Sequence, residues 1–267
     1  VAVCFGAWHG GVKGAIMGMA CSTLVIVVMT RCALRVEMRR FGIQNWWREA
    51  WAEWPVLVSF SLPAFLTTLI AGPVYWACNA LLANQTNGYS ELGIYNAANQ
   101  WYAAVSFLPS LLTAAALPVL SERYGVDDWR GSAKIVHALM RVMALIAAPV
   151  ALVLCLLSPL IMRGYGGTFA TGHMVLVLAV ITAGIHVVVT PCWFFIMASG
   201  KMWTCFVMNL GCSLATLIIS ILVIHHGAIG LASARLAAYG LHAVWIVAYV
   251  SFVFKLKDSQ GEVAACK

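Results

Sequence analysis

The sequence predicts an all-α polytopic membrane protein with seven transmembrane helices. Hydrophobic residues make up 63% of the 267 residues and charged residues only 9%, and the mean hydropathy is +0.90. These values lie far outside the range of a soluble domain. Apolar runs recur along the chain at the length that crosses a bilayer, about 20 residues. The segments between them are too short to fold alone, which places any function inside the membrane.

The apolar runs divide the chain into the end of one lobe and the whole of another. Residues 1–33 look like the end of an N-terminal lobe, because a glycine turn precedes its last span at 14–33. Residues 55–254 contain six more spans and are interpreted as a complete six-helix C-terminal lobe, followed by a tail at 255–267. The six predicted spans are 55–83, 92–120, 136–161, 173–198, 203–224 and 228–254.

Basic residues are concentrated on one set of loops, and the alternate set holds only Lys13 and Arg163. By the positive-inside rule the richer set is cytoplasmic, which predicts a cytoplasmic C-terminus. Because the basic residues sit at membrane ends, the net charge of +7 does not call for a nucleic-acid partner. The richer set is Arg31, Arg35, Arg39, Arg40, Arg48, Arg123, Arg130, Lys134, Lys201, Lys255, Lys257 and Lys267.

Residues 34–54 join the first two spans and are rich in tryptophan and arginine. Trp47, Trp51 and Trp54 recur at helical steps, whereas Arg40 and Arg48 fall elsewhere. This pattern predicts an amphipathic helix on the cytoplasmic surface, with its indoles at headgroup depth. Such a helix either only anchors the chain or also transmits motion between two lobes.

The stretch from 91 to 122 organises the prediction of function. About thirty uncharged residues lie between its terminal carboxylates, enough to cross a bilayer, yet polar side chains follow one helical face. Lipid does not tolerate such a face, so we expect it to line a cavity. The polar stripe consists of Tyr95, Asn99, Tyr102, Ser106, Ser110 and Thr113.

Arg235 lies about two turns, roughly 10 Å, inside the last span, a costly position for a charge that faces lipid. It either meets an anionic group in a cavity or snorkels and caps carbonyls. Arg141 lies closer to the end of its helix, where snorkelling explains it. His186 and His242 also lie within spans, and a neutral, hydrogen-bonded histidine is the commoner case than a proton relay.

A glycine pattern occurs twice, once before the first span and once before the last. Small residues at this spacing let a neighbouring helix approach closely. The two occurrences indicate either an internal repeat of two lobes or a chance similarity of glycine-rich turns. The pattern consists of His9, Gly11, Gly14 and Gly18, and again of His225, Gly227, Gly230 and Ala234.

Nine cysteines are scattered without a CxxC pair, so they read as packing residues and predict no metal site, disulfide framework or cofactor. The nine carboxylates all lie in loops or at the ends of spans: Glu37, Glu49, Glu53, Glu91, Glu122, Asp127, Asp128, Asp258 and Glu262.

The run GYSELGIYNAANQWYAAVSFLPSLLTAAALPVLSE at 88–122 resembles the Wzx-like flippases of the superfamily that also contains the MATE drug exporters and the lipid II flippase. The similarity is strongest in this run, which corresponds to the start of the second lobe in that branch. It is carried by Leu92, Gly93, Tyr95, Ala97, Ala98, Gln100, Pro109, Pro118, Leu120 and Ser121.

The resemblance implies about twelve helices in two lobes around a central cavity, with this chain as an N-terminally truncated member in a bacterial inner membrane. It implies a transporter, not an enzyme, that flips undecaprenyl-diphosphate-linked oligosaccharide from the inner to the outer leaflet for polysaccharide or O-antigen biosynthesis. The implied partners are this substrate, membrane lipids and the missing N-terminal lobe. Aromatic, amide and cationic groups suit a sugar diphosphate. The residues expected to bind substrate are Tyr95, Asn99, Gln100, Tyr102 and Arg235.

Three alternatives stay open at this stage. A cation-coupled MATE-type drug antiporter needs a carboxylate within the membrane, and the nine acids here lie outside the spans or at their ends. A membrane glycan polymerase or acyltransferase needs a catalytic group and a sizeable outer loop, which the short outer connections do not offer. A nonfunctional remnant of a transporter is the third.

Overall fold

The computed structural model describes residues 2–40, 42 and 53–265, and this part consists of helices joined by short turns. It divides into two compact units, Val1–Pro55 and Val56–Lys267, called unit 1 and unit 2 below. Six segments of the described residues are long and apolar enough to cross a membrane. The last of them, Met202–Ser259, contains two successive helices, so the all-α polytopic prediction is confirmed.

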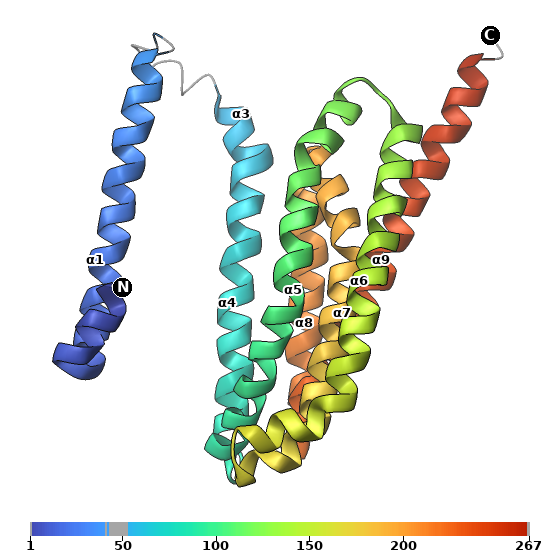
Figure 1. Cartoon of the computed structure of the whole chain (residues 1–267). Helices are drawn as coiled ribbons and strands as arrows, with labels where there is room; N and C mark the ends of the chain where they lie inside the picture. Colours follow the sequence, from blue (N-terminus) through green and yellow to red (C-terminus); the bar gives the residue numbers. More distant parts are fainter. Residues whose placement is uncertain (1, 41, 43–52, 266–267) are drawn as a thin grey trace. The chain divides into compact units, whose positions relative to one another are not determined.

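Unit 1 consists mainly of α1 (Ala2–Arg40), which is broken at Gly10 and Gly11 (Figure 1). Gly11 has φ 54° and ψ −137°, a conformation that only glycine adopts readily. After this turn the chain reverses, and the backbones of Gly6 and Gly14 meet so closely that neither position has room for a Cβ atom. The small-residue spacing predicted a close approach by a neighbouring helix, and at Gly14 the approaching segment is the part of α1 that precedes the turn.

The long part of α1 presents an apolar surface, because none of the residues in its most hydrophobic window is buried within the structure. Leu24 and Ile26, for example, are 64% and 63% exposed. The helix continues to Arg40, so residues 34–40 extend the first span and do not begin a separate surface helix. Most of the predicted Trp- and Arg-rich linker, residues 43–52, lies outside the described residues.

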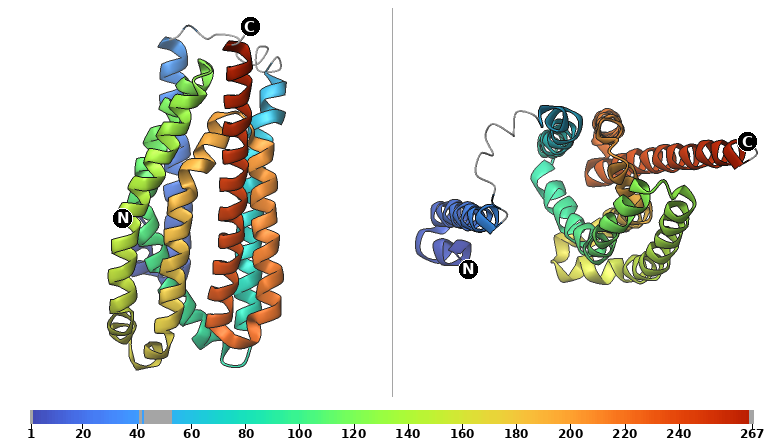
Figure 2. Two further views of the ribbon diagram at one scale, coloured as in Figure 1. Left: turned by 90° about the vertical axis from the view of Figure 1, so that its right-hand side faces the viewer. Right: turned by 90° about the horizontal axis from the view of Figure 1, so that it is seen from above.

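Unit 2 is a bundle of six long helices that run up and down beside one another (Figure 1, Figure 2). A short helix, α3 (Trp54–Val56), lies at the boundary of the two units, and a π-helical turn η1 (Leu57–Ser61) follows it. The wide turn ends just before Pro63, which has no N–H to donate to the preceding turn. The long helices are α4 (Leu62–Ala83), α5 (Gly88–Gly125), α6 (Trp129–Gly164), α7 (His173–Ala198), α8 (Met202–Val223) and α9 (Gly227–Ala265), with 3₁₀ turns η2 (Gly167–Gly172) and η3 (Ile224–His226).

The helices continue through the internal prolines Pro73, Pro109, Pro118, Pro149, Pro159 and Pro191. A side chain supplies a compensating hydrogen bond at Pro159, where Ser158 Oγ donates at 2.8 Å to the carbonyl of Cys155, the carbonyl that the missing proline N–H would have bonded. Helix α7 is the most buried span and packs against α5, α6 and α9, while α8 packs against α4 and α9. At Gly211, a Cβ atom would lie 2.7 Å from the ring of Trp245, so glycine lets α8 and α9 approach.

Two large apolar clusters hold the bundle together, one toward each end, and a third, smaller cluster joins Met143 and Ala147 on α6 to Val187 on α7. The first contains Leu82, Tyr95, Met162, Leu176 and Leu231, and the second contains Leu120, Phe195, Met208 and Ile246, each with further neighbours. On α5, α7 and α9 the polar residues described next fall between the positions that belong to the two clusters. The bundle therefore has a polar layer between two hydrophobic cores.

Candidate functional site

The polar layer of unit 2 is built around Arg235 on α9. Its Nη1 donates to Oδ1 of Asn99 on α5 at 2.6 Å, and its guanidinium carbon lies 3.9 Å from the ring centroid of Tyr102. The guanidinium is thus held by a hydrogen bond on one side and by an aromatic face on another. Its side chain is partly buried, and no carboxylate in the described part of the chain pairs with it.

Two further helices, α4 and α7, contribute to the layer. Tyr75 on α4 accepts a hydrogen bond from Nδ2 of Asn99 at 3.3 Å, which fixes the amide so that its oxygen faces Arg235. The hydroxyl of Tyr102 lies 3.1 Å from Nδ1 of His186 on α7. Tyr239, one turn beyond Arg235, packs edge-on against His186 with ring centroids 5.5 Å apart. The result is a connected polar network across four helices.

The structure brings together four of the five predicted binding residues. Asn99, Tyr102 and Arg235 are in direct contact, and Tyr95 interacts electrostatically with the same guanidinium. The ring of Tyr95 is only 5% exposed and belongs to the first apolar cluster, so its hydroxyl is the part that reaches the polar layer. Gln100 makes a different contact, because its Oε1 accepts from the hydroxyl of Tyr165 at 3.3 Å.

The polar stripe of α5 changes character toward its other end. Thr113 is fully buried and bonded to its own helix, and Ser110 likewise donates to the carbonyl of Phe107 at 2.6 Å. Ser106 lies one turn beyond Tyr102, and its buried hydroxyl oxygen has no hydrogen-bond partner among the described residues. Along the stripe, Asn99 and Tyr102 therefore belong to the polar network, and Ser106 offers a hydroxyl without a partner among the described residues.

A cavity of about 150 Å³ adjoins the network between α7, α8 and α9. His186, Thr190, Asn209, Tyr239 and His242 contribute its polar lining, and Nδ1 of His242 is buried without a partner in the described structure. A polar cavity of this size holds several water molecules but no sugar phosphate. It is a side chamber that can hydrate the network.

Two members of the network, Tyr75 and Tyr239, were not identified from the sequence. Tyr239 follows Arg235 at a spacing of four, so it shares a helical face with it and could have been found. No local pattern marks Tyr75, which reaches Asn99 from a different helix.

Other polar features of the bundle serve its packing. On α8, Ser220 is fully buried beside the thiol of Cys78 on α4, and Asn209 donates to the carbonyl of Thr67 at 3.3 Å. Glu91, in the first turn of α5, accepts from the backbone N–H of Ala228 at 2.8 Å and so caps the start of α9. Glu91, the carboxylate closest in sequence to Asn99, thus caps a helix in the structure.

Comparisons with known proteins connect this architecture to polysaccharide export. A family model described as polysaccharide biosynthesis protein matches residues 1–168. Over 82 residues the chain is 38% identical to the EPS I polysaccharide export inner membrane protein EpsE of Ralstonia solanacearum, and 37% identical to EpsE of Ralstonia nicotianae (strain ATCC BAA-1114 / GMI1000). Each match covers 31% of this chain and 19% of the relative.

Among solved structures, the chain is similar to an outward-facing multidrug resistance MATE family transporter of the MOP superfamily. The TM-score is 0.70 at 15% sequence identity, over 94% of this chain and 58% of that transporter. At this identity the likeness shows the fold alone. The predicted resemblance to flippase-like proteins of this superfamily is confirmed, and with a family match over more than half of its residues, the chain belongs to the polysaccharide biosynthesis protein family.

Proposed function

We propose that this chain is part of a transporter that flips a lipid-linked oligosaccharide diphosphate, such as an undecaprenyl-diphosphate glycan, from the inner to the outer leaflet. The family and the polysaccharide export relatives support a transport role in polysaccharide production. The observation that carries the proposal is Arg235. A charge is costly within a membrane, and this one has hydrogen-bonding and aromatic neighbours but no paired carboxylate in the described residues. A diphosphate group supplies the missing anion.

The neighbours of Arg235 suit the rest of such a substrate. Aromatic rings such as Tyr102 and Tyr239 stack on sugar faces, and Asn99 and the unpartnered hydroxyl of Ser106 can bond sugar hydroxyls. In the proposed mechanism unit 2 forms one of two lobes, and a second lobe supplies the opposite wall of the cavity. The cavity then opens to each side of the membrane in turn.

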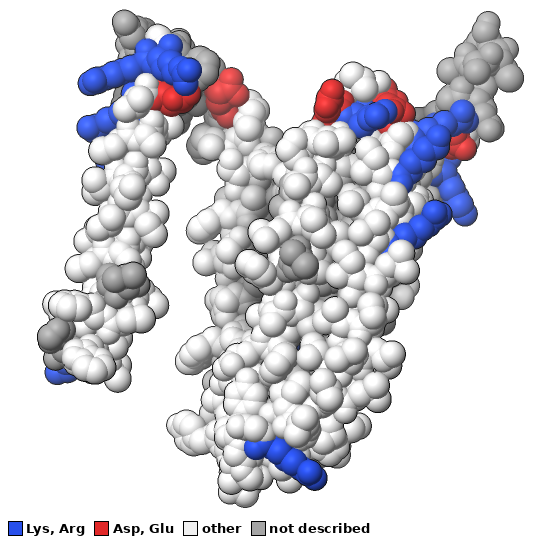
Figure 3. Space-filling model, in the orientation of Figure 1, with Lys and Arg blue, Asp and Glu red and all other residues white. Residues whose placement is uncertain are grey.

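The orientation that we propose follows from charge. In unit 2, Lys and Arg gather mainly at one end (Figure 3). Arg163 lies in the last turn of α6, at the opposite end of that helix from Arg130 and Lys134. The positive-inside rule assigns the basic end and the C-terminus to the cytoplasm of an inner-membrane protein. Accessibility of single cysteines at Arg163 and Lys201 to a membrane-impermeant thiol reagent tests this: labelling of Lys201→Cys in intact cells would reverse it.

The functional test is export of glycan by the complete transporter carrying Arg235→Ala or Asn99→Ala. We expect both variants to insert normally and to lose surface glycan, because each removes one side of the anion site. Arg141→Ala is the matched control, since Arg141 is an exposed arginine on α6 outside the network. Normal surface glycan in both site variants would remove these residues from the binding site.

The main alternative, a cation-coupled drug antiporter of the MATE type, rests on the fold alone. Among the described residues of unit 2 the carboxylates lie in loops or near helix ends, so the described structure offers no intramembrane carboxylate for ion coupling. Drug resistance conferred by the complete gene, with no change of surface glycan when it is deleted, would favour this alternative.

A further inference from the structure

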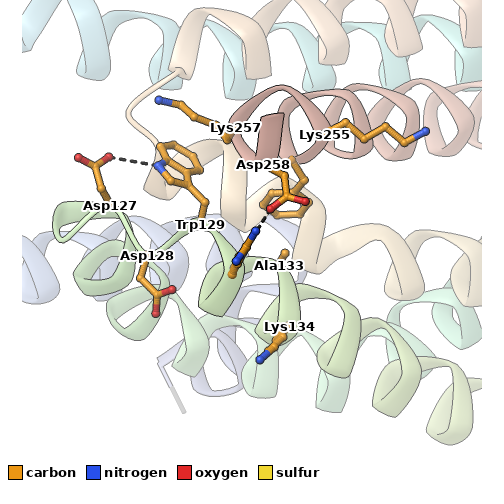
Figure 4. Close-up of a pocket in the computed structure, with 10 residues that line it drawn as sticks. Asp127, Asp128, Trp129, Ala133, Lys134, Lys255, Lys257 and Asp258 are labelled. Carbon is orange, nitrogen blue, oxygen red and sulfur yellow. Dashed lines mark hydrogen bonds and ion pairs between the residues drawn. The ribbon is translucent and has the colours of Figure 1, made fainter. Parts of the chain in front are cut away.

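A second site lies at the basic end of unit 2, far along α9 from Arg235. There a groove of about 790 Å³ separates the first turns of α6 from the last turns of α9 (Figure 4). Trp129 and Phe254 line it with aromatic carbon, and Arg130, Lys134, Lys255 and Lys257 contribute four cationic groups. The polar network around Arg235 contributes no residue to this groove.

The aromatic lining is held in place by its neighbours. Trp129 packs edge-on against Tyr124 and Phe195, with ring centroids 4.9 and 6.4 Å apart. Phe254 packs against Phe195 at 4.6 Å. The indole nitrogen of Trp129 donates to Oδ1 of Asp127 at 3.2 Å, so the polar edge of the indole is occupied. A rigid aromatic surface at the end of a membrane span is typical of headgroup depth.

Each carboxylate that lines the groove already has a donor. Asp127 accepts from Trp129, and Asp258 accepts from Nε of Arg130 at 2.8 Å. Asp128 accepts from the backbone N–H of Gly131 and from Arg123, and these two donors lower the pKa of its carboxyl below the ordinary value. The three acids are therefore hydrogen-bonded within the protein, and the four cationic side chains of the lining outnumber them.

The lysines, in contrast, have ammonium groups to offer. No described carboxylate forms an ion pair with Lys134, Lys255 or Lys257. The ammonium of Lys257 lies 4.6 Å from the ring centroid of Trp129, so cation and aromatic surface meet at one point of the groove. This combination suits a ligand that carries an anionic phosphate beside apolar carbon.

We propose that this groove binds the headgroup of an anionic phospholipid, with the phosphate at Lys257 and the glycerol and first acyl carbons against Trp129 and Phe254, while Lys255 adds positive charge from another side of α9 (Figure 4). The lysines lie at the end of a span, where they face the phosphates of the adjacent leaflet. A free inorganic phosphate would use only the cationic part of the lining and leave the aromatic part unused. The site is independent of the transported glycan, and neither site requires the other.

The test compares soluble short-chain lipids on the purified full chain. Dihexanoylphosphatidylglycerol, dihexanoylphosphatidylcholine and inorganic phosphate are titrated separately, and the dissociation constants are measured by calorimetry. We expect the anionic lipid to bind more tightly than the other two. Lys257→Gln is expected to weaken its binding about five-fold, because one lysine near an anionic lipid contributes about that factor. Lys255→Gln is a second variant with the same expected direction.

Lys201→Gln is the matched control, because Lys201 is an exposed lysine between α7 and α8 that lies 5.9 Å from the Tyr249 ring and not in the groove. It should change the constant by less than about two-fold. Equal binding of the choline lipid would exclude anion recognition. Equal binding of phosphate, lost in the same variants, would identify a small-anion site instead. If Lys201→Gln weakened lipid binding as much as Lys257→Gln does, binding would depend on overall surface charge and not on this groove.

Discussion

Replacing Glu91 tests whether a carboxylate in the first turn of α5 stabilises the bundle or couples an ion. In the structure Glu91 Oε2 accepts from the N–H of Ala228, the second residue of α9, at 2.8 Å. The first N–H groups of a helix lack intrahelical partners and form the positive end of its dipole. A carboxylate from a different helix therefore caps α9 and ties α5 to it.

The expected size of the effect follows from this geometry. Glu91→Gln retains an acceptor oxygen but removes the charge at the helix end, at a cost of about 0.3–1 kcal/mol, and up to about 2 kcal/mol where the site is partly buried. Glu91→Ala also leaves the N–H unsatisfied, at a cost of about 1–3 kcal/mol. For a unit of this size each kcal/mol corresponds to a shift of about 2–4 °C in the unfolding temperature. Glu91→Ala should therefore unfold several degrees below the wild type, and Glu91→Gln between the two.

The assay is thermal unfolding of the purified protein in detergent, followed by the exposure of buried cysteine thiols. Glu122→Gln is the control, because Glu122 is an exposed carboxylate near the other end of the same helix with no side-chain hydrogen bond in the described structure. Unchanged unfolding of both Glu91 variants would refute the capping argument. Loss of transport in Glu91→Gln with unchanged unfolding would instead point to ion coupling by this carboxylate.

Three further predictions concern single residues. Gly227→Ala should lower the unfolding temperature by several degrees, since its φ of 66° and ψ of −141° are strained for alanine and its Cβ would lie 2.7 Å from the capping carboxylate. Tyr102→Phe should retain the aromatic support of Arg235 and most diphosphate binding, whereas Tyr102→Leu should weaken binding about three- to thirty-fold, measured by titration with inorganic diphosphate. The pKa of Asp128 is lowered, chiefly by the hydrogen bond from the N–H of Gly131. The stabilising cap that Asp128 forms on α6 is therefore fully present above the ordinary aspartate pKa of about 4, and it is lost as the pH falls through the lowered pKa. Hydrogen exchange at the Gly131 amide, corrected for intrinsic rates, should accelerate in acid and in Asp128→Ala at pH 7.

The sequence was sufficient for features that repeat along one helix. Hydropathy located the spans, and a spacing of three and four placed Asn99, Tyr102 and Ser106 on one face of α5, where the structure has them near the polar layer. It was insufficient wherever a partner comes from elsewhere in the chain. Asn99 meets Arg235 at a sequence separation of 136, and its second partner, Tyr75, comes from α4. The periodicity of one helix carries no information about which neighbour faces it.

Boundaries were less predictable than faces. The first span was expected to end at residue 33, but α1 continues to Arg40, because charged residues in a helix do not interrupt its hydrogen bonds. Arg31, Arg35 and Arg39 recur every four residues and so extend the helix beyond its apolar section. Hydropathy detects where lipid contact ends, whereas the helix ends where its backbone bonds end.

The two glycine turns now distinguish between the readings that the sequence left open. Gly11 and Gly227 have nearly the same backbone angles, with φ 54° and 66° and ψ −137° and −141°. Three residues later in each case, Gly14 and Gly230 lie so close to a preceding carbonyl, that of Gly6 or Val223, that a Cβ atom does not fit. Two glycine-rich sequences that are alike only by chance would share composition. They would not also share a rare backbone conformation and a close contact three residues after it. The internal repeat is therefore the favoured interpretation, and the glycines are required by the backbone of the turn and not by a bound ligand.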